Sequence, residues 1–167
     1  MMDEKTVDLT VIHVFDAPIE KVWQAWTDEK IVQRWWGVDG FSNILAKMDV
    51  REGGISHVGM RASKEYGGKD YYNTFKYTRV VHHKLIQYIS NFADKDGNVI
   101  TPEMAGLPSE TPMDKKQQVA FKALGSGKTE VTITEFGWLA RGVMMERSQH
   151  GLEQTLANID KILGASK

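Results

Sequence analysis

The stretch DAPIEKVWQAWTDEKIVQRWWG, residues 16–37, decides how this chain folds, because its periodicity differs from that of the sequence on either side. Its first half spaces apolar residues three or four positions apart, as on one face of a helix: Ile19, Val22, Trp23 and Trp26. Pro18 suits the first turn of this helix, where its missing N–H costs nothing. Thr27 and Asp28 can end the helix and cap a second one over about residues 28–36, which Gly37 ends.

Extended segments precede and follow these two short helices. In TVDLTVIHVF, residues 6–15, every second residue is placed to share one face of a strand: Val7, Leu9, Val11, His13 and Phe15. Further alternation, broken by turns such as REGG and by a GSGK hairpin, continues to about residue 137. We predict strands from NILAKMDV, GISHVGMRAS, YYNTFKYTRVV, KLIQYISNF, QVAFKAL and TEVTITEFGW, with residues 93–116 as a long surface loop.

The last part of the chain returns to the helical period. An amphipathic stripe runs along it and ends near Gly164: Met145, Ser148, Leu152, Thr155, Leu156, Ile159, Ile162 and Leu163. This order of elements predicts an α+β fold in a single domain over residues 1–167. We expect a curved antiparallel sheet of about six to seven strands wrapped around a long C-terminal helix, with a small-molecule pocket between them.

The composition is that of an ordinary globular domain. Of the 167 residues, 41% are hydrophobic and 26% are charged, and the net charge of −1 gives no reason to expect a nucleic-acid partner. The chain has no cysteine, and its five histidines lack metal-binding spacing, so we expect neither a metal site nor a cofactor. No apolar run is long enough to span a membrane, and the N-terminus lacks the apolar segment of a secretory signal. We therefore expect a cytoplasmic protein.

Several stretches together resemble a known family. VFDAPIEKVWQAWTDEKIVQRWWGVDGFS resembles its opening signature, MDVREGG its Asp-x-Arg-x-Gly-Gly corner, and SNFADKDGNVITPEMAGLP its F-x-D-x-x-G-N loop. VAFKALGSGKTEVTITEFGW and HGLEQTLANIDKIL are similar to its penultimate hairpin and its closing helix. The family comprises proteins similar to the C-terminal domain of the activator of the heat-shock-protein-90 ATPase, within the START-like (Bet v 1-like, SRPBCC) helix-grip superfamily. The resemblance covers nearly the whole chain and implies a START-like domain with a cavity.

Two positions depart from the family's pattern toward smaller side chains. Leu152 stands where the family commonly has Trp after the glycine of its closing helix, and Ser56 stands where a bulky residue is common. Both changes would leave more room in the cavity. The chaperone-binding half of the large activator has no counterpart in the sequence, which weakens a co-chaperone function.

The adjacent Trp35 and Trp36 cannot both enter one core site, because neighbours on a helix point about 100° apart. Trp35 continues the stripe of Ile31 and Val32, so we assign it to packing, and we place Trp36 at the rim of the space between sheet and helix. Strand parity and helix spacing add further candidate residues for the wall of this ligand cavity: Val58, Met60, Phe75, Tyr77, Tyr88, Phe121, Ile133, Glu135, Met144, Met145, Ser148, Gln149 and Leu152.

Glu135 is the one acidic residue in this set, and it shares a strand face with Ile133. Arg79, His57 and Gln149 are its candidate partners, and a structural ion pair between Glu135 and Arg79 stays equally open. No serine elbow, catalytic dyad or cofactor fingerprint accompanies Glu135. We therefore assign no catalytic residue and favour a protein without enzymatic activity.

The sequence thus predicts non-catalytic binding of a small hydrophobic or amphipathic ligand, oriented by Tyr77, Tyr88 or Gln149. Two alternatives stay open. A protein-interaction (co-chaperone-like) module would have an exposed apolar patch and a filled interior. An enzyme or a toxin-sequestering resistance protein would have convergent polar groups with shifted pKa values inside the cavity. The sequence also leaves a homodimer open.

Overall fold

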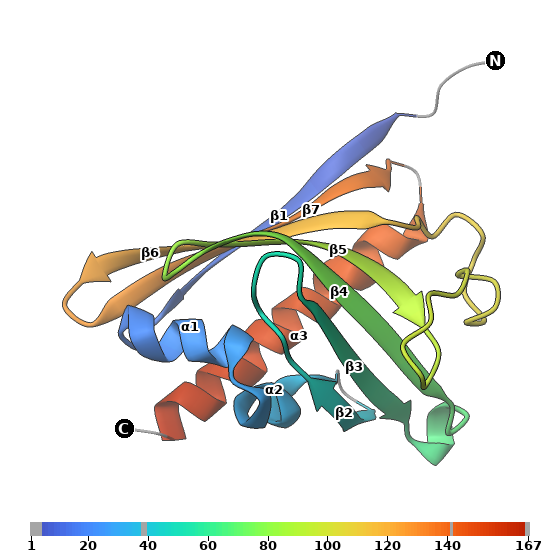
Figure 1. Ribbon diagram of the computed structural model, residues 1–167, viewed down its shortest axis with the longest axis horizontal. Coiled ribbons are helices and arrows are strands. Elements are labelled where there is room, and N and C mark those ends of the chain that lie inside the picture. The colour runs from blue at the N-terminus through green and yellow to red at the C-terminus, as the bar shows by residue number, and fades with distance from the viewer. Residues whose placement is uncertain (1–4, 38–39, 141, 166–167) are drawn as a thin grey trace.

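A curved antiparallel sheet packs against a long C-terminal helix in the computed structural model of this chain (Figure 1). The structure describes residues 5–37, 40–140 and 142–165. The helices are α1 (Ile19–Thr27), α2 (Glu29–Trp35) and α3 (Val143–Ala165), with a short 3-10 turn at Lys64–Tyr66. The strands are β1 (Thr6–Phe15), β2 (Phe41–Lys47), β3 (Ile55–Ala62), β4 (Asp70–Val81), β5 (Leu85–Ala93), β6 (Lys115–Gly125) and β7 (Lys128–Leu139).

The seven strands form one sheet in the order β1-β7-β6-β5-β4-β3-β2, so that β1 and β2 are its edges. Helix α3 crosses one face of this sheet, and α1 and α2 lie on the same side, with α2 beside β2 and α1 against β6 and β7 (Figure 1). The predicted α+β architecture is confirmed. Residues 1–4, on which the expectation about a secretory signal partly rests, lie outside the described residues.

The two short helices form where the sequence predicts them. Helix α1 buries Val22, Trp23 and Trp26 against the core. Asp28 ends α1 and caps α2, because its side chain accepts a hydrogen bond from the backbone N–H of Lys30 at 2.9 Å. The backbone N–H of Trp36 closes the last turn of α2 by donating to a carbonyl of the same helix.

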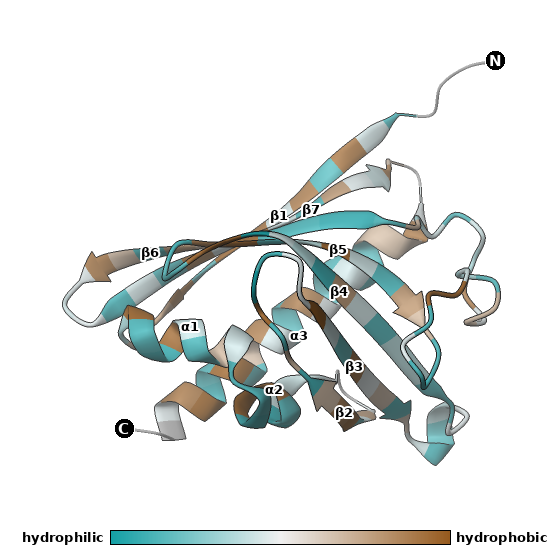
Figure 2. Cartoon of the chain, in the orientation of Figure 1, coloured by the Kyte–Doolittle hydropathy of each residue, from teal (hydrophilic) through white to brown (hydrophobic). Residues whose placement is uncertain are grey.

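The GSGK hairpin is confirmed between β6 and β7. Ser126 and Gly127 adopt φ values of 54° and 72°, as in the tight turns whose twist matches that of paired strands. Along the strands and along α3, apolar and polar residues alternate (Figure 2), and the apolar ones supply the buried face. This alternation is the reason that the strand predictions from local pattern succeed.

Two details of the outer strands differ from the predictions. Strand β2 begins at Phe41 and ends at Lys47, so Met48 and Val50 pack against the core from outside it. Val7 is 37% exposed instead of sharing the buried face, because the register shifts between Val7 and Leu9. Opposite this shift lies Gly137, whose φ of 76° permits the irregular backbone.

The start of β6 is the difference that matters most for the site. This strand begins at Lys115, so it includes two residues that the prediction assigns to the preceding loop. The side chains of Asn91 and Asp114 fix this start by two hydrogen bonds. The backbone N–H of Asp114 donates to Asn91 Oδ1 at 2.7 Å, and Asn91 Nδ2 donates to Asp114 Oδ1 at 2.9 Å.

Helix α3 is buried unevenly along its length. Its second half is in the core through Leu156, Ile159, Ile162 and Leu163, as the amphipathic stripe predicts. His13 of β1 and Asp160 of α3 add a contact of 2.7 Å between their side chains at this end. The first half of α3 has no fully buried side chain and lies over a hollow in the sheet face.

Candidate functional site

A cavity of about 380 Å³ lies between the inner face of the sheet and the first half of α3. Pockets of this volume commonly bind small molecules. The wall is built by α1, α2, strands β3 to β7, the loop before β6, and α3. Of the residues that the sequence places here, the cavity is lined by Trp36, Met60, Phe75, Tyr88, Ile133, Glu135, Met144, Ser148 and Leu152.

Aromatic side chains form one continuous part of this wall. Trp35 is buried, and its indole Nε1 donates to the carbonyl of Ala25 at 2.6 Å, which joins α2 to α1. Its ring nevertheless borders the cavity, so Trp35 packs in the core and also lines the cavity wall. The ring centroid of Trp36 lies 5.9 Å from that of Trp35 and 5.5 Å from that of Phe75. The ring centroid of Tyr88 lies 4.8 Å from that of Phe75 and continues the aromatic part of the wall.

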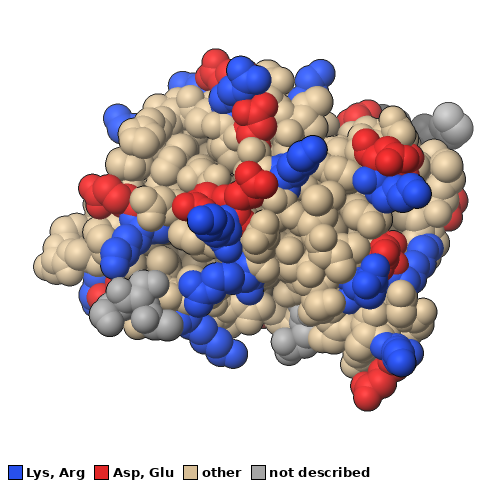
Figure 3. Space-filling model, turned by 60° about the horizontal axis from the view of Figure 1, so that its bottom comes forward, with Lys and Arg blue, Asp and Glu red and all other residues tan. Residues whose placement is uncertain are grey.

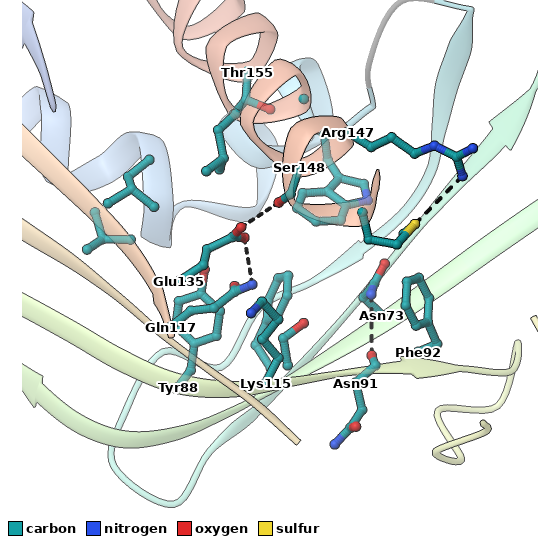
Figure 4. A pocket seen from close by; sticks show the side chains of 18 of the residues that line it. Asn73, Tyr88, Asn91, Phe92, Lys115, Gln117, Glu135, Arg147, Ser148 and Thr155 are labelled. Carbon is teal, nitrogen blue, oxygen red and sulfur yellow. Dashed lines mark hydrogen bonds between the residues drawn. The ribbon is translucent and has the colours of Figure 1, made fainter. Parts of the chain in front are cut away.

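Glu135 is the carboxylate on the cavity wall, and its oxygens accept hydrogen bonds from three donors, of which Gln117 and Ser148 are labelled in Figure 4. Gln117 Nε2 donates to Oε2 at 2.8 Å, Trp138 Nε1 donates to Oε1 at 3.1 Å, and Ser148 Oγ donates to Oε1. Ser148 belongs to α3, so this cluster joins the helix to the sheet. Burial raises the pKa of the Glu135 carboxyl, while the hydrogen bond from Ser148 and the charge of Lys115 lower it.

Lys115 lies beside this cluster and is only 7% exposed. Its ammonium Nζ donates to the carbonyl of Phe136 at 2.8 Å and lies 3.6 Å from the ring centroid of Trp138. Burial lowers the pKa of the Lys115 ammonium to about 8, although the charges of Glu135 and Asp8 raise it. Lys115 is therefore a desolvated cation with its side chain on the cavity wall.

Five residues that the sequence places at the wall do not line the cavity. Val58 and Phe121 are in the core, where Phe121 packs against the rings of Trp23 and Trp26. Tyr77 is also buried there, and its hydroxyl donates to Ser56 Oγ at 2.7 Å. On α3, Met145 does not border the cavity although its neighbour Met144 does, and Gln149 is exposed and donates to Glu153.

Ser56 does not border the cavity either, so its small size leaves no extra room there. Its hydroxyl accepts from Tyr77 and from the backbone N–H of Asp49, which makes it a buried hydrogen-bonding group of the core. Leu152 does line the cavity, as expected from its departure from the family pattern.

Arg79 and His57 do not join Glu135. His57 Nε2 donates to the carbonyl of Asp94 at 3.0 Å, and its ring lies against Tyr72. Arg79 is exposed on β4. The candidate ion pair between Arg79 and Glu135 is therefore replaced by the neutral donors described above.

Sequence reasoning missed Lys115 and Gln117, because the first was assigned to a loop and the second to its junction with the strand. Counting back in steps of two from Val119 reaches both residues, so strand parity could have found them. It also missed Arg147, although this residue follows Met144 by three positions on α3, and Thr111 and Pro112 of the loop, for which no periodic signal exists. Arg147 and His150 are exposed and mark the open side of the cavity.

Two buried side-chain atoms in the described part of the chain have no hydrogen-bond partner, and both belong to residues of the cavity wall. They are Trp36 Nε1 and Thr111 Oγ1. Buried polar groups are normally paired. Among the described residues, the unpaired buried side-chain atoms thus belong to the wall of this cavity.

Charged side chains of both signs lie on the face of the molecule that Figure 3 shows, interspersed among uncharged ones. None of the helices in the described ranges is long and apolar enough to cross a membrane. Within the same ranges, no three His, Asp or Glu side chains gather in a way that could hold a metal ion.

A curved antiparallel sheet that grips a C-terminal helix, with a cavity between them, defines the START-like (SRPBCC) helix-grip class of domains. Residues 16–164 match the family described as Activator of Hsp90 ATPase homolog 1-like protein, so this chain belongs to that family. The resemblance found in the sequence is confirmed.

Solved structures with this fold extend over nearly the whole chain. A protein from Mycobacterium smegmatis has a TM-score of 0.72 and 23% identity, covering 97% of this chain and 96% of its own. An AHSA1-like protein from Aeromonas hydrophila has a TM-score of 0.68 and 22% identity, with 96% and 94% covered. An AHSA1 protein from Silicibacter pomeroyi has a TM-score of 0.74 and 15% identity, with 96% and 100% covered. These identities establish a shared fold alone. No curated protein matches the chain.

Proposed function

We propose that this protein binds a small hydrophobic or amphipathic molecule in the cavity between its sheet and α3, without catalysing a reaction. The observation that carries the proposal is the cavity of about 380 Å³ with an aromatic wall made by Trp35, Trp36, Phe75 and Tyr88. A ligand that buries about 200 Å² of apolar surface gains about 5 kcal/mol from that burial. A preformed cavity reduces the ordering cost of binding. A binding free energy of about 5 kcal/mol corresponds to a dissociation constant of about 0.2 mM, and a ligand that buries more apolar surface would bind more tightly.

A protein-interaction module has less support. Such a module is expected to have a filled interior and a contiguous apolar patch on its surface. The most exposed apolar side chains include Ile12, Ile55 and Met104, which belong to β1, β3 and the loop before β6. Their distribution over separate elements, together with the cavity, favours a small ligand over a partner protein.

An enzyme is the second candidate function, because Glu135 and Lys115 lie on one wall with pKa values displaced in opposite directions. Both oxygens of Glu135 already accept hydrogen bonds, and Lys115 donates to a backbone carbonyl. A substrate would have to displace these contacts before either group could transfer a proton. We therefore favour binding. Mass spectrometry of compounds recovered after incubation with the protein would detect a chemical change and would support the enzyme.

The binding proposal is tested with the neutral fluorescent probe N-phenyl-1-naphthylamine, after native mass spectrometry of the purified protein. We expect saturable one-site binding to the wild type. Leu152→Trp should abolish it, because the larger side chain fills the cavity from α3. Ala157→Trp places the same side chain on an exposed position of α3 and should leave binding intact. Binding that is absent in the wild type, or unchanged in Leu152→Trp, would contradict a ligand in this cavity.

A further inference from the structure

Polar side chains cross the inner face of the sheet in two neighbouring rows. In the first row, Tyr88 of β5 pairs with Gln117 of β6, which pairs with Glu135 of β7. In the second row, Ser90 pairs with Lys115. Directly opposed residues on adjacent strands share a face, and all five of these side chains line the cavity. Figure 4 labels Tyr88, Gln117, Glu135 and Lys115.

Apolar side chains lie next to these rows, so the cavity has two chemically different ends. The next pair along β6 and β7 is Val119 with Ile133, and Trp26 of α1 borders the cavity on this side. A ligand that fills both ends must itself be amphipathic, with its apolar body toward α1 and its polar group toward Lys115.

The hydrogen-bond acceptors of the polar rows are largely occupied by donors of the protein itself. Glu135 receives hydrogen bonds from Gln117, Trp138 and Ser148. It is the carboxylate among the described lining residues, so the wall has little capacity left for a cationic ligand group.

Hydrogen-bond donors on the same wall, in contrast, are available to a ligand. The ammonium of Lys115 has three N–H bonds, and from the described residues it contacts one carbonyl and one aromatic ring face. Among the described residues, the hydroxyls of Tyr88 and Ser90 have no hydrogen-bonded partner, although both line the cavity. At the open side, Arg147 adds a second cation, and within the described part of the chain its guanidinium makes one long contact, of 3.6 Å, to Met144 Sδ.

We propose that the ligand of this cavity is an amphipathic carboxylate whose anionic group binds Lys115 and whose apolar body lies against Trp26, Val119 and Ile133. This inference rests on the proposed binding function and adds the chemical class of the ligand. A carboxylate supplies the acceptors that the wall lacks, and it neutralises a buried cation that has no ion-pair partner within 4.0 Å among the described residues.

The test compares 1-naphthaleneacetate with the neutral 1-naphthaleneacetamide by isothermal titration calorimetry at pH 7. Both compounds carry the same apolar ring system, so they differ in the charge of the polar group. We expect the wild type to bind the carboxylate at least about tenfold more tightly than the amide. Lys115→Met should remove this preference, chiefly by weakening the carboxylate.

Lys116→Met is the matched control, because it removes the same charge from the exposed neighbour on the outer face of β6. We expect it to keep the preference. The comparison of the two compounds on the wild type needs no variant, so the proposal stays testable if Lys115→Met fails to fold.

The outcomes separate this inference from the binding function on which it rests. Equal affinity of the two compounds for the wild type would overturn the carboxylate class and leave cavity binding standing. The same holds if neither compound binds while N-phenyl-1-naphthylamine does. If none of the three compounds binds, both proposals fail. A preference that persists in Lys115→Met would also overturn the assignment to Lys115.

Discussion

At the scale of single residues, Ser56 shows how one small side chain organises the core. It is completely buried and accepts two hydrogen bonds, from the hydroxyl of Tyr77 at 2.7 Å and from the backbone N–H of Asp49 at 3.0 Å. The second bond ties the segment after β2 to β3. A bulky residue at this position would have to displace both contacts.

Ser56→Ala should lower the free energy of unfolding by about 1–3 kcal/mol, because it leaves the buried Tyr77 hydroxyl without its acceptor. Tyr77→Phe removes the same hydrogen bond from the other side. We expect the double variant to lose less stability than the sum of the two single variants, as measured by urea denaturation. Strict additivity would mean that the bond between these side chains does not contribute.

The raised pKa of Glu135 predicts that the stability of the protein depends on pH. Burial raises its pKa in the folded protein above the ordinary value of 4.5. Over the pH range between the unfolded and folded pKa values, the folded state holds more protons, so stability falls as the pH rises. Glu135→Gln removes this titration. Urea denaturation from about pH 4 to pH 7 should therefore show the wild type losing stability relative to the variant as pH increases. A constant difference over this range would contradict the raised pKa.

At the scale of elements, α3 has two parts with different tasks. Its second half anchors the helix in the core, whereas its first half covers the cavity and is tied to the sheet by Ser148 and Glu135. Helices α1 and α2 complete the enclosure by placing Trp26, Trp35 and Trp36 at one end. The short helices thus contribute more to the shape of the cavity than to the size of the core.

Alanine substitutions in the two halves of α3 should differ in their effect on stability. Ile159 is completely buried, so Ile159→Ala should cost about 2–5 kcal/mol. Leu152 already borders the cavity and has packing partners on fewer sides. Leu152→Ala should therefore cost clearly less than Ile159→Ala in the same urea denaturation experiment. Equal losses would indicate that the first half of α3 packs as tightly as the second.

At the scale of the whole molecule, the fold leaves space in its interior because a twisted sheet curves away from a straight helix. The sheet contacts α3 closely near β1 and at the end of the helix, and the cavity occupies the remaining distance. Binding in this space should stabilise the entire fold, since an unfolded chain has no cavity.

N-phenyl-1-naphthylamine at about ten times its dissociation constant should stabilise the wild type by about 1.4 kcal/mol. For a domain of this size, that corresponds to a rise in melting temperature of roughly 3–6 °C. Differential scanning calorimetry would measure the rise. Ala157→Trp should show it and Leu152→Trp should not. A rise in both variants would place the probe outside the cavity.

Much of the fold follows from local pattern, as three regions show. The helix spacing from Ile19 to Trp26, the alternation in β1 and the stripe that ends in Leu163 each reflect a backbone period set by local hydrogen bonding. Such periods can be counted along the chain. The order of these elements then leaves few ways to bury their apolar faces, which is why the α+β architecture could be predicted.

The wall of the cavity was decided by the tertiary structure. Parity assigns Tyr77 and Tyr88 to the same inner face, yet Tyr77 meets Ser56 in the core and Tyr88 borders the cavity. Lys115 entered the site because Asn91 and Asp114 start β6 earlier than its hydrophobic pattern does. Periodicity says which face of a strand a side chain occupies. The curvature of the sheet and the position of α3 determine whether that side chain meets another one or an open space, and both depend on contacts between residues far apart in the sequence.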